Sequence, residues 1–167
     1  AYKSYQEVAD ILKVQASEVS SKLKQNLETL EEYKLKISNF RKDELIKLTQ
    51  DYSAKSSKLG KYNVIIETIS LENTNESKEV ASNMVNNFDV DICILFSNIS
   101  GKTTIVGSSK PSVDLDISII TNVLSSLYGG GASKDPNLSI GGGPGKYETS
   151  KAIDVATPTE NLSPIIT

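Results

Sequence analysis

The first third of the chain carries apolar residues at helical spacing. They start near Val8 and, after a polar break at residues 15–17, resume at Val19 and recur every three to five residues as far as Tyr52. This stretch contains neither glycine nor proline. Because a helix brings positions three and four apart onto one face, the spacing predicts a short helix and then about forty helical residues, as one helix or as two with a bend near 39–43.

The long helical segment has a narrow apolar stripe that it cannot bury alone. Leu23, Leu30 and Ile37 recur at seven-residue spacing, with Asn26, Tyr33 and Phe40 three residues after each. This repeat resembles a coiled-coil seam, but it covers fewer than four clean heptads and then shifts phase. Packing on the short helix, packing on the rest of the chain and self-association all remain open. For self-association we expect an interface formed by Leu23, Leu27, Leu30 and Ile37.

After residue 60 the pattern changes to alternating strands and helices. Runs rich in β-branched residues predict strands over 62–71, 91–97 and 102–108, of which the last two form a hairpin. Amphipathic spacing predicts helices over 77–88, 115–128 and 147–155. The predicted fold class is α/β, with a long N-terminal helical arm followed by a small α/β domain with a mixed sheet. We place the helical subdomain at 1–58, the globular subdomain at 59–156 and a flexible tail at 157–167.

The composition indicates that part of the chain is elongated, and the charge distribution argues against non-specific binding of nucleic acid. Only 38% of the 167 residues are apolar and 6% aromatic, which suggests that part of the chain is extended and faces solvent. The net charge of -3 divides into a slightly basic N-terminal part and an acidic remainder. Neither part is the basic block of a non-specific polyanion binder, so any nucleic-acid contact must be local and shaped. No apolar run reaches the length of a membrane span, and the missing initiator Met suggests a piece of a longer protein.

The candidate chemistry is limited by the absence of histidine. Without histidine, Ser-His-Asp and Cys-His sites cannot form, and one cysteine cannot complete an ordinary structural zinc site. The carboxylate pairs are interpreted as structural, since they lie on the helical arm or begin a strand or helix. We therefore expect neither catalysis nor a metal or cofactor in this chain. Cys93, within an apolar run, is interpreted as a small buried residue, which suits a reducing, cytoplasmic compartment.

Two glycine clusters, at 129–131 and 141–143, stand out near the end of the chain. Ordering a glycine triplet costs backbone entropy, so each cluster needs a structural or functional reason. Glycines permit positive φ, close backbone approach to a ligand and runs of N–H groups that bind phosphate. The intervening Asp135 and Pro136 indicate a defined turn rather than a flexible linker. No strand directly precedes the first cluster, so the segment matches neither the P-loop nor the dinucleotide fingerprint.

This glycine–turn–glycine segment resembles the signature of the DHHA1 domain, in the version found at the C-terminus of archaeal-like alanyl-tRNA synthetases. Residues 8–19, followed by a long Lys/Glu-rich helix, resemble the linker after the editing domain of these enzymes. Together the two similarities span most of the chain. Asp135 stands where the family often has Arg and Ile140 where Gln is common, so the turn lacks a cation and an amide.

The resemblance implies a module without catalytic activity of its own. In this family the helical part promotes homodimerisation and the globular part contacts the outer corner of alanine-specific tRNA, assisting the catalytic and editing domains of the same parent chain. Lysine 102 is a further basic candidate near the segment. The RNA-binding candidates are Gly129, Gly130, Gly131, Lys134, Gly141, Gly142, Gly143, Lys146 and Lys110.

Two other functions remain open. One is the substrate-binding half of a DHH-family phosphoesterase, in which the glycine segment would hold a nucleotide while another domain supplied metal ligands. The family's usual histidine-containing glycine motif is absent from this chain, which counts against that function. The other is a purely structural oligomerisation piece without an RNA partner.

Overall fold

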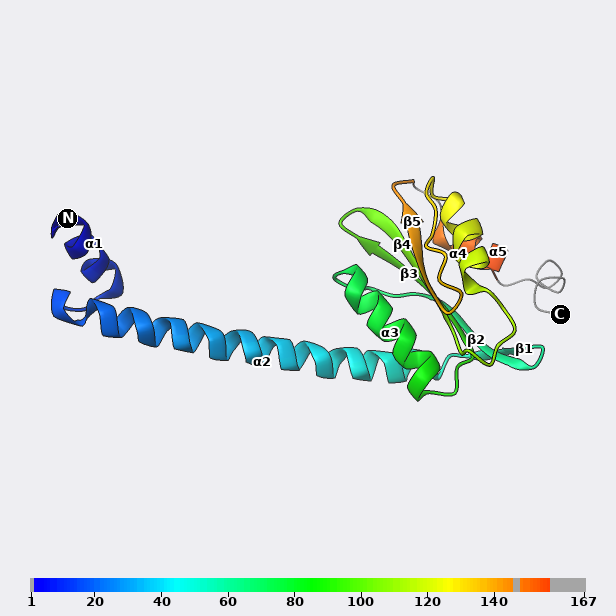
Figure 1. Ribbon diagram of the computed structural model, residues 1–167, viewed down its shortest axis with the longest axis horizontal. Coiled ribbons are helices and arrows are strands. Elements are labelled where there is room, and N and C mark those ends of the chain that lie inside the picture. Colours follow the sequence, from blue (N-terminus) through cyan, green and yellow to red (C-terminus); the bar gives the residue numbers. More distant parts are fainter. Residues whose placement is uncertain (1, 146–147, 157–167) are drawn as a thin grey trace. The chain divides into compact units, whose positions relative to one another are not determined.

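The computed structural model describes residues 2–145 and 148–156 (Figure 1). Its contacts divide the chain into two compact units, Ala1–Glu44 and Leu45–Thr167. The first unit contains α1 (Tyr2–Leu12), the 3-10 turn η1 (Ala16–Glu18) and most of α2 (Val19–Ser53). Of the two arrangements predicted for the long helical segment, the structure has the single helix, 35 residues in length.

A tight turn joins the two helices of the first unit. Lys13 ends α1 with a left-handed backbone, φ 54°, and the Val14 N–H donates to the Ala9 carbonyl at 3.1 Å. The side chain of Glu18 accepts a hydrogen bond from the Gln15 N–H at 3.1 Å, which satisfies one donor before α2 begins.

The second unit is built on a five-stranded mixed sheet. Its strands are β1 (Ser57–Leu59), β2 (Tyr62–Thr68), β3 (Ile92–Ile99), β4 (Lys102–Ser109) and β5 (Leu138–Gly143), in the spatial order β1-β2-β3-β4-β5. β2 and β3 are parallel and are joined through α3 (Thr74–Asn87), whereas the other neighbouring pairs are antiparallel. The α/β class and the mixed sheet predicted from the sequence are therefore confirmed, while β1 and β5 were not predicted.

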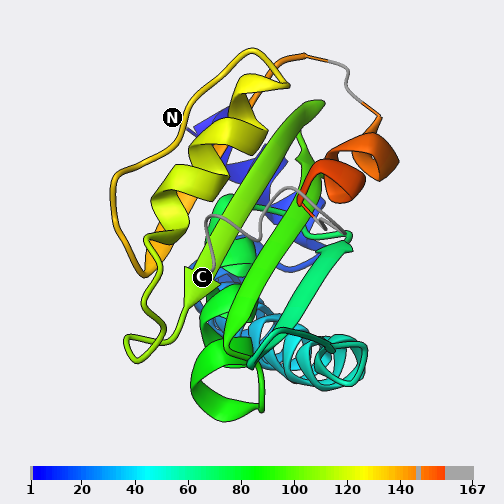
Figure 2. The same ribbon diagram turned by 90° about the vertical axis from the view of Figure 1, so that its right-hand side faces the viewer.

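Helices cover both faces of this sheet, so the unit has three layers (Figure 2). On one face, Ile92, Ile94 and Phe96 pack in a cluster with α4 (Ile117–Ser126) and α5 (Thr149–Ala156). On the other face, Cys93 and Leu95 pack with α3 and the last turns of α2. Because β3 is covered on both faces, its sequence is a continuous apolar run rather than an alternating one.

The end of α2 belongs to the sheet unit. Leu45 is buried, and Leu48 and Tyr52 pack against the same cluster as α3. The division after Glu44 consequently falls earlier than the boundary after residue 58 that the sequence suggested. The predicted tail, 157–167, lies outside the described residues.

Candidate nucleic-acid interface

The first glycine run ends α4. Gly129 has φ 77°, a left-handed conformation that stops the helix, and its N–H donates to the Ser126 carbonyl at 3.1 Å. The Gly130 N–H donates to the Ser125 carbonyl at 3.1 Å. These two N–H groups therefore complete the helix end, and neither forms part of an open run of donors.

The second glycine run is the end of β5, so it is not the loop that the sequence suggested. Gly141, Gly142 and Gly143 pair with β4 residues, and Gly142 has φ 134°. A Cβ at Gly142 would overlap the Thr103 carbonyl oxygen, and one at Gly143 would overlap the Tyr128 carbonyl oxygen. The structural need for glycine here is thus close packing of β5 between β4 and the end of α4.

The two glycine runs are brought together by the fold. A Cβ at Gly130 would overlap the Gly142 carbonyl oxygen, and one at Gly141 would overlap the Ser125 hydroxyl. Ala132 forms a β-bridge with Gly141, which covers the outer edge of β5. The close backbone approach inferred from the sequence is present, and it is an approach of one glycine run to the other.

The turn between the glycine runs is defined, as predicted. The Asp135 carboxylate accepts hydrogen bonds from the Asn137 and Leu138 N–H groups at 2.9 and 3.0 Å. These two bonds lower the pKa of Asp135. The Pro136 carbonyl accepts from the Ile117 N–H at 3.1 Å, which attaches the turn to the start of α4. Asp135 therefore has a structural role in this turn.

The candidate lysines divide between the two ends of β5, which are about 17 Å apart. β5 begins at Leu138, opposite Ser108, and ends at Gly143, opposite Thr103. Lys110 and Lys134 accordingly belong to the first end, whereas Lys102 belongs to the second. Lys146 lies outside the described residues.

Lys110 is engaged within the chain. Its ammonium nitrogen lies 3.3 Å from an Asp91 carboxylate oxygen, and both side chains are partly exposed, at 29% and 22%. Asp91 also accepts a hydrogen bond from the Asn63 N–H at 2.8 Å, and this bond, together with Lys110, lowers the pKa of Asp91. Lys134, by contrast, is exposed beside the Asp135 turn. Of these two lysines, Lys134 is the one whose charge is presented to solvent.

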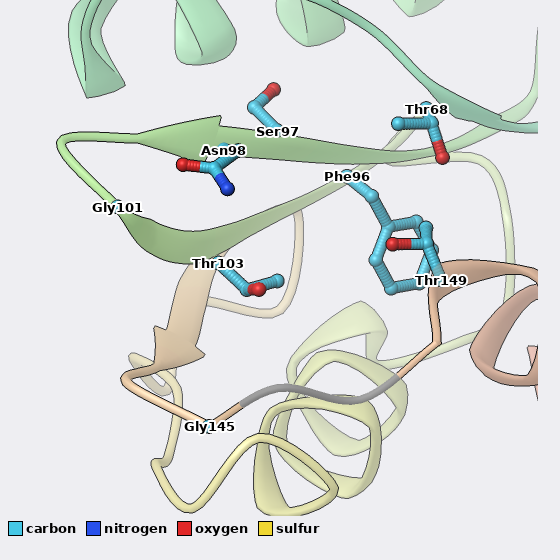
Figure 3. A pocket seen from close by; sticks show the side chains of 8 residues that line it. All are labelled: Thr68, Phe96, Ser97, Asn98, Gly101, Thr103, Gly145 and Thr149. Atoms are coloured by element: carbon cyan, nitrogen blue, oxygen red, sulfur yellow. The ribbon is translucent and has the colours of Figure 1, made fainter.

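A cavity of about 330 Å³ lies at the end of the sheet where β2 and β3 finish (Figure 3). The register places Thr68 opposite Phe96 and Asn98 opposite Thr103, so these four share the face covered by α4 and α5. Thr149, at the start of α5, and Gly145 line the other side. The face thus changes from apolar to hydroxyl and amide groups at the strand ends, where ligands commonly bind in α/β sheets. No sequence pattern indicates this cavity, because it depends on strand register.

The four residues expected at a self-association interface share one property in the structure: their side chains are exposed. Leu23 is 47% exposed, Leu27 55%, Leu30 48% and Ile37 69%. Within the described residues of the first unit, none of these side chains is covered by α1.

Other kinds of site are not found in the part of the chain that the structure describes. No group of histidine, cysteine, aspartate or glutamate residues there is arranged to hold a metal ion. Over the same residues, no helix combines the length and the apolar character needed to cross a membrane. Cys93 is buried beside the Met84 sulfur at 3.4 Å, and burial raises the pKa of its thiol.

No protein-family profile and no curated protein sequence matches the chain. Among solved structures, the chain is similar to the C-Ala domain of Aquifex aeolicus alanyl-tRNA synthetase, with a TM-score of 0.55 and 14% identity over 61% of this chain and 94% of that domain. It also matches an exopolyphosphatase-related protein from Bacteroides fragilis, with a TM-score of 0.47 and 15% identity over 73% of this chain and 36% of that one. The first similarity establishes a shared fold, and the second is too weak to support an argument.

Proposed function

We propose that this chain is the non-catalytic C-terminal module of an alanyl-tRNA synthetase. In this role it binds the outer corner of alanine-specific tRNA in the cytoplasm, and it assists aminoacylation and editing by other domains of the parent chain. The observation that carries the proposal is the fold shared with the C-Ala domain, which is matched over 94% of its length. The glycine–turn–glycine segment at residues 129–143 supports the same assignment.

The RNA-binding surface is proposed to centre on the segment between α4 and β5. Lys134 offers an exposed cation there, and the Asp135 turn holds the neighbouring backbone in one conformation. A folded RNA is recognised through its shape, its backbone and its unstacked bases, so one ordered segment with few charges suits it better than a basic block. The glycines contribute indirectly, because they allow β5 and the end of α4 to lie close together.

Homodimerisation is proposed to use the exposed apolar face of α2. Leu23, Leu27, Leu30 and Ile37 lie on this face and are about half exposed or more. Covering them with a second copy would remove apolar surface from water, which favours association.

The salt dependence of tRNA binding tests the proposed RNA surface. Each lysine that neutralises a phosphate contributes about one unit to the slope of log K against log salt. We expect the Lys134→Ala variant to bind tRNA more weakly and with a slope lower by about one. Lys110→Ala is the matched control, and it should change the slope less because Lys110 already faces Asp91 at 3.3 Å. Equal affinity and slope in the wild type and in Lys134→Ala would show that Lys134 is not part of the RNA-binding surface.

Two results would redirect the assignment as a whole. Absence of tRNA binding by a chain that still dimerises would support a purely structural oligomerisation piece. Hydrolysis of oligonucleotides or cyclic dinucleotides by the parent protein would support the phosphoesterase alternative.

A further inference from the structure

The apolar face of α2 within the first unit is uncovered over several helical turns. Beside the four residues named above, Tyr33 is 58% exposed and Phe40 is 67% exposed. In the described part of this unit, the buried apolar side chains are Ala9 and Val19, at its N-terminal end. Contiguous exposed apolar surface of this kind marks an interaction site in soluble proteins.

We propose that a second copy of this chain covers this face, with the two α2 helices antiparallel. The inference rests on the homodimerisation included in the proposed function, and it adds the orientation. Six positions alternate at steps of three and four residues and form one seam: Leu23, Asn26, Leu30, Tyr33, Ile37 and Phe40. The α2 residues from 19 to 44 extend about 39 Å, long enough for such a seam.

Side-chain size favours the antiparallel orientation. When the helices run in opposite directions, Leu23 lies against the partner's Phe40 and Leu30 lies against the partner's Tyr33. Every aromatic ring then meets an aliphatic side chain, so the layers have similar volumes. A parallel pair would instead place Tyr33 against the partner's Tyr33 and Phe40 against the partner's Phe40, between thinner layers of Leu and Ile. Evenly filled layers pack at higher density.

Charge favours the same orientation. In the antiparallel pair Lys22 flanks the partner's Asp43 on both sides of the dimer, and Lys36 flanks the partner's Thr29. In a parallel pair Lys36 would flank the partner's Arg41 on both sides, and like charges at such positions oppose association. Glu44, 3.0 Å from Arg41 on the same helix, offsets part of that repulsion.

Cysteine cross-linking of the full chain tests the orientation directly. Chains carrying Leu23→Cys are mixed with tagged chains carrying Phe40→Cys and are oxidised under mild conditions. We expect rapid mixed disulfides between the two kinds of chain and little cross-linking of either variant alone. The wild-type chain is the control, and it should not cross-link because its one cysteine, Cys93, is fully buried. Rapid cross-linking within Leu23→Cys alone would overturn the antiparallel arrangement.

A charge exchange supplies a second, independent measurement. Lys22→Asp should raise the dimer dissociation constant roughly 2- to 30-fold, because two exposed ion pairs are lost in each dimer. Adding Asp43→Lys to the same chain restores the pairs and should recover most of that loss. Lys24→Asp, which alters a lysine away from the seam, is the control and should leave the constant unchanged. Failure of the double variant to recover would count against the arrangement.

The outcomes separate this inference from the proposed function. Sedimentation that shows monomers at high micromolar concentration overturns dimerisation and orientation together, while tRNA binding is measured separately. A dimer that cross-links in parallel overturns the orientation alone. A dimer with antiparallel cross-links and no affinity for tRNA keeps the arrangement and removes the RNA role.

Discussion

Two separate structural reasons require glycine at position 142: the backbone conformation and the lack of space for a side chain. Its φ of 134° lies where other residues are strained, and a Cβ there would overlap the Thr103 carbonyl oxygen. Gly60 has only the first reason, since its φ is 62° and nothing lies near its Cβ position. Gly131 has neither, because the nearest atom to its Cβ position, Oδ1 of Asn122, is 3.4 Å away.

These three glycines form a graded series for substitution by alanine. We expect a loss of unfolding free energy of more than about 3 kcal/mol for Gly142→Ala, about 1–2 kcal/mol for Gly60→Ala and less than about 0.5 kcal/mol for Gly131→Ala. Urea denaturation followed by circular dichroism measures the order. Similar losses at all three positions would contradict the packing argument.

Asp91 lies at the opposite end of β3 from the cavity, and its ionisation makes the stability of the fold depend on pH. The Asn63 N–H and Lys110 lower its pKa in the folded chain, so the ionised form is favoured by folding. The stabilisation is therefore present above the unfolded-state pKa of about 3.9, and it is lost as pH falls through the lower folded-state pKa. Asp91→Asn should be less stable than wild type at pH 7, and the difference should shrink towards pH 2.

Thermal unfolding of both proteins across this pH range measures the effect. Lys110→Met removes the cation and keeps the Asn63 hydrogen bond, which is the largest single cause of the shift, so part of the pH dependence should remain in this variant. A stability difference between wild type and Asp91→Asn that does not vary with pH would contradict the assignment.

At the scale of elements, α2 uses one apolar stripe for two environments. Leu45 is 4% exposed and packs with α3 on the sheet, whereas Leu30 is 48% exposed. Residues 30 and 45 are both apolar positions of the same helix, and only their surroundings differ. The helix therefore combines an internal packing role with an uncovered face.

Alanine substitution separates these two environments. Leu45→Ala should lower the unfolding free energy by about 2–5 kcal/mol at any protein concentration, because it leaves a cavity. Leu30→Ala should cost less than about 0.5 kcal/mol in the monomer, and it should weaken the concentration dependence of unfolding. Denaturation at two protein concentrations distinguishes the cases, and equal, concentration-independent losses would show that Leu30 has no association role.

The strand β5 shows where prediction of elements from the sequence stops. Three of its six residues, Gly141, Gly142 and Gly143, have low strand propensity, so the sequence predicts a loop before a helix. The strand forms because β4 offers a free edge to pair with. It needs glycine because the end of α4 lies so close that side chains would not fit. Strand β1 has only three residues, too few to give an alternating pattern in the sequence.

At the scale of the whole molecule, the chain comprises two units with different sources of stability. The unit Leu45–Thr167 has apolar clusters on both faces of its sheet, whereas most large apolar side chains of Ala1–Glu44 are exposed. The globular unit therefore has a core of its own, whereas the helical unit leaves most of its large apolar side chains exposed.

Local periodicity was enough to predict the long helix, the elements β2, α3 and β3, the β3–β4 hairpin and the α/β class with a mixed sheet, because each depends on neighbouring residues. That β2 and β3 run parallel is decided by the tertiary structure. The same periodicity identified the apolar stripe of α2, and the residues Asp135 and Pro136 indicated the defined turn. Contacts between distant residues decided the rest: the pairing of Lys110 with Asp91, the strand β5 and the packing of one glycine run on the other. Those features depend on register and close approach, which become defined only when segments far apart in the chain are placed side by side.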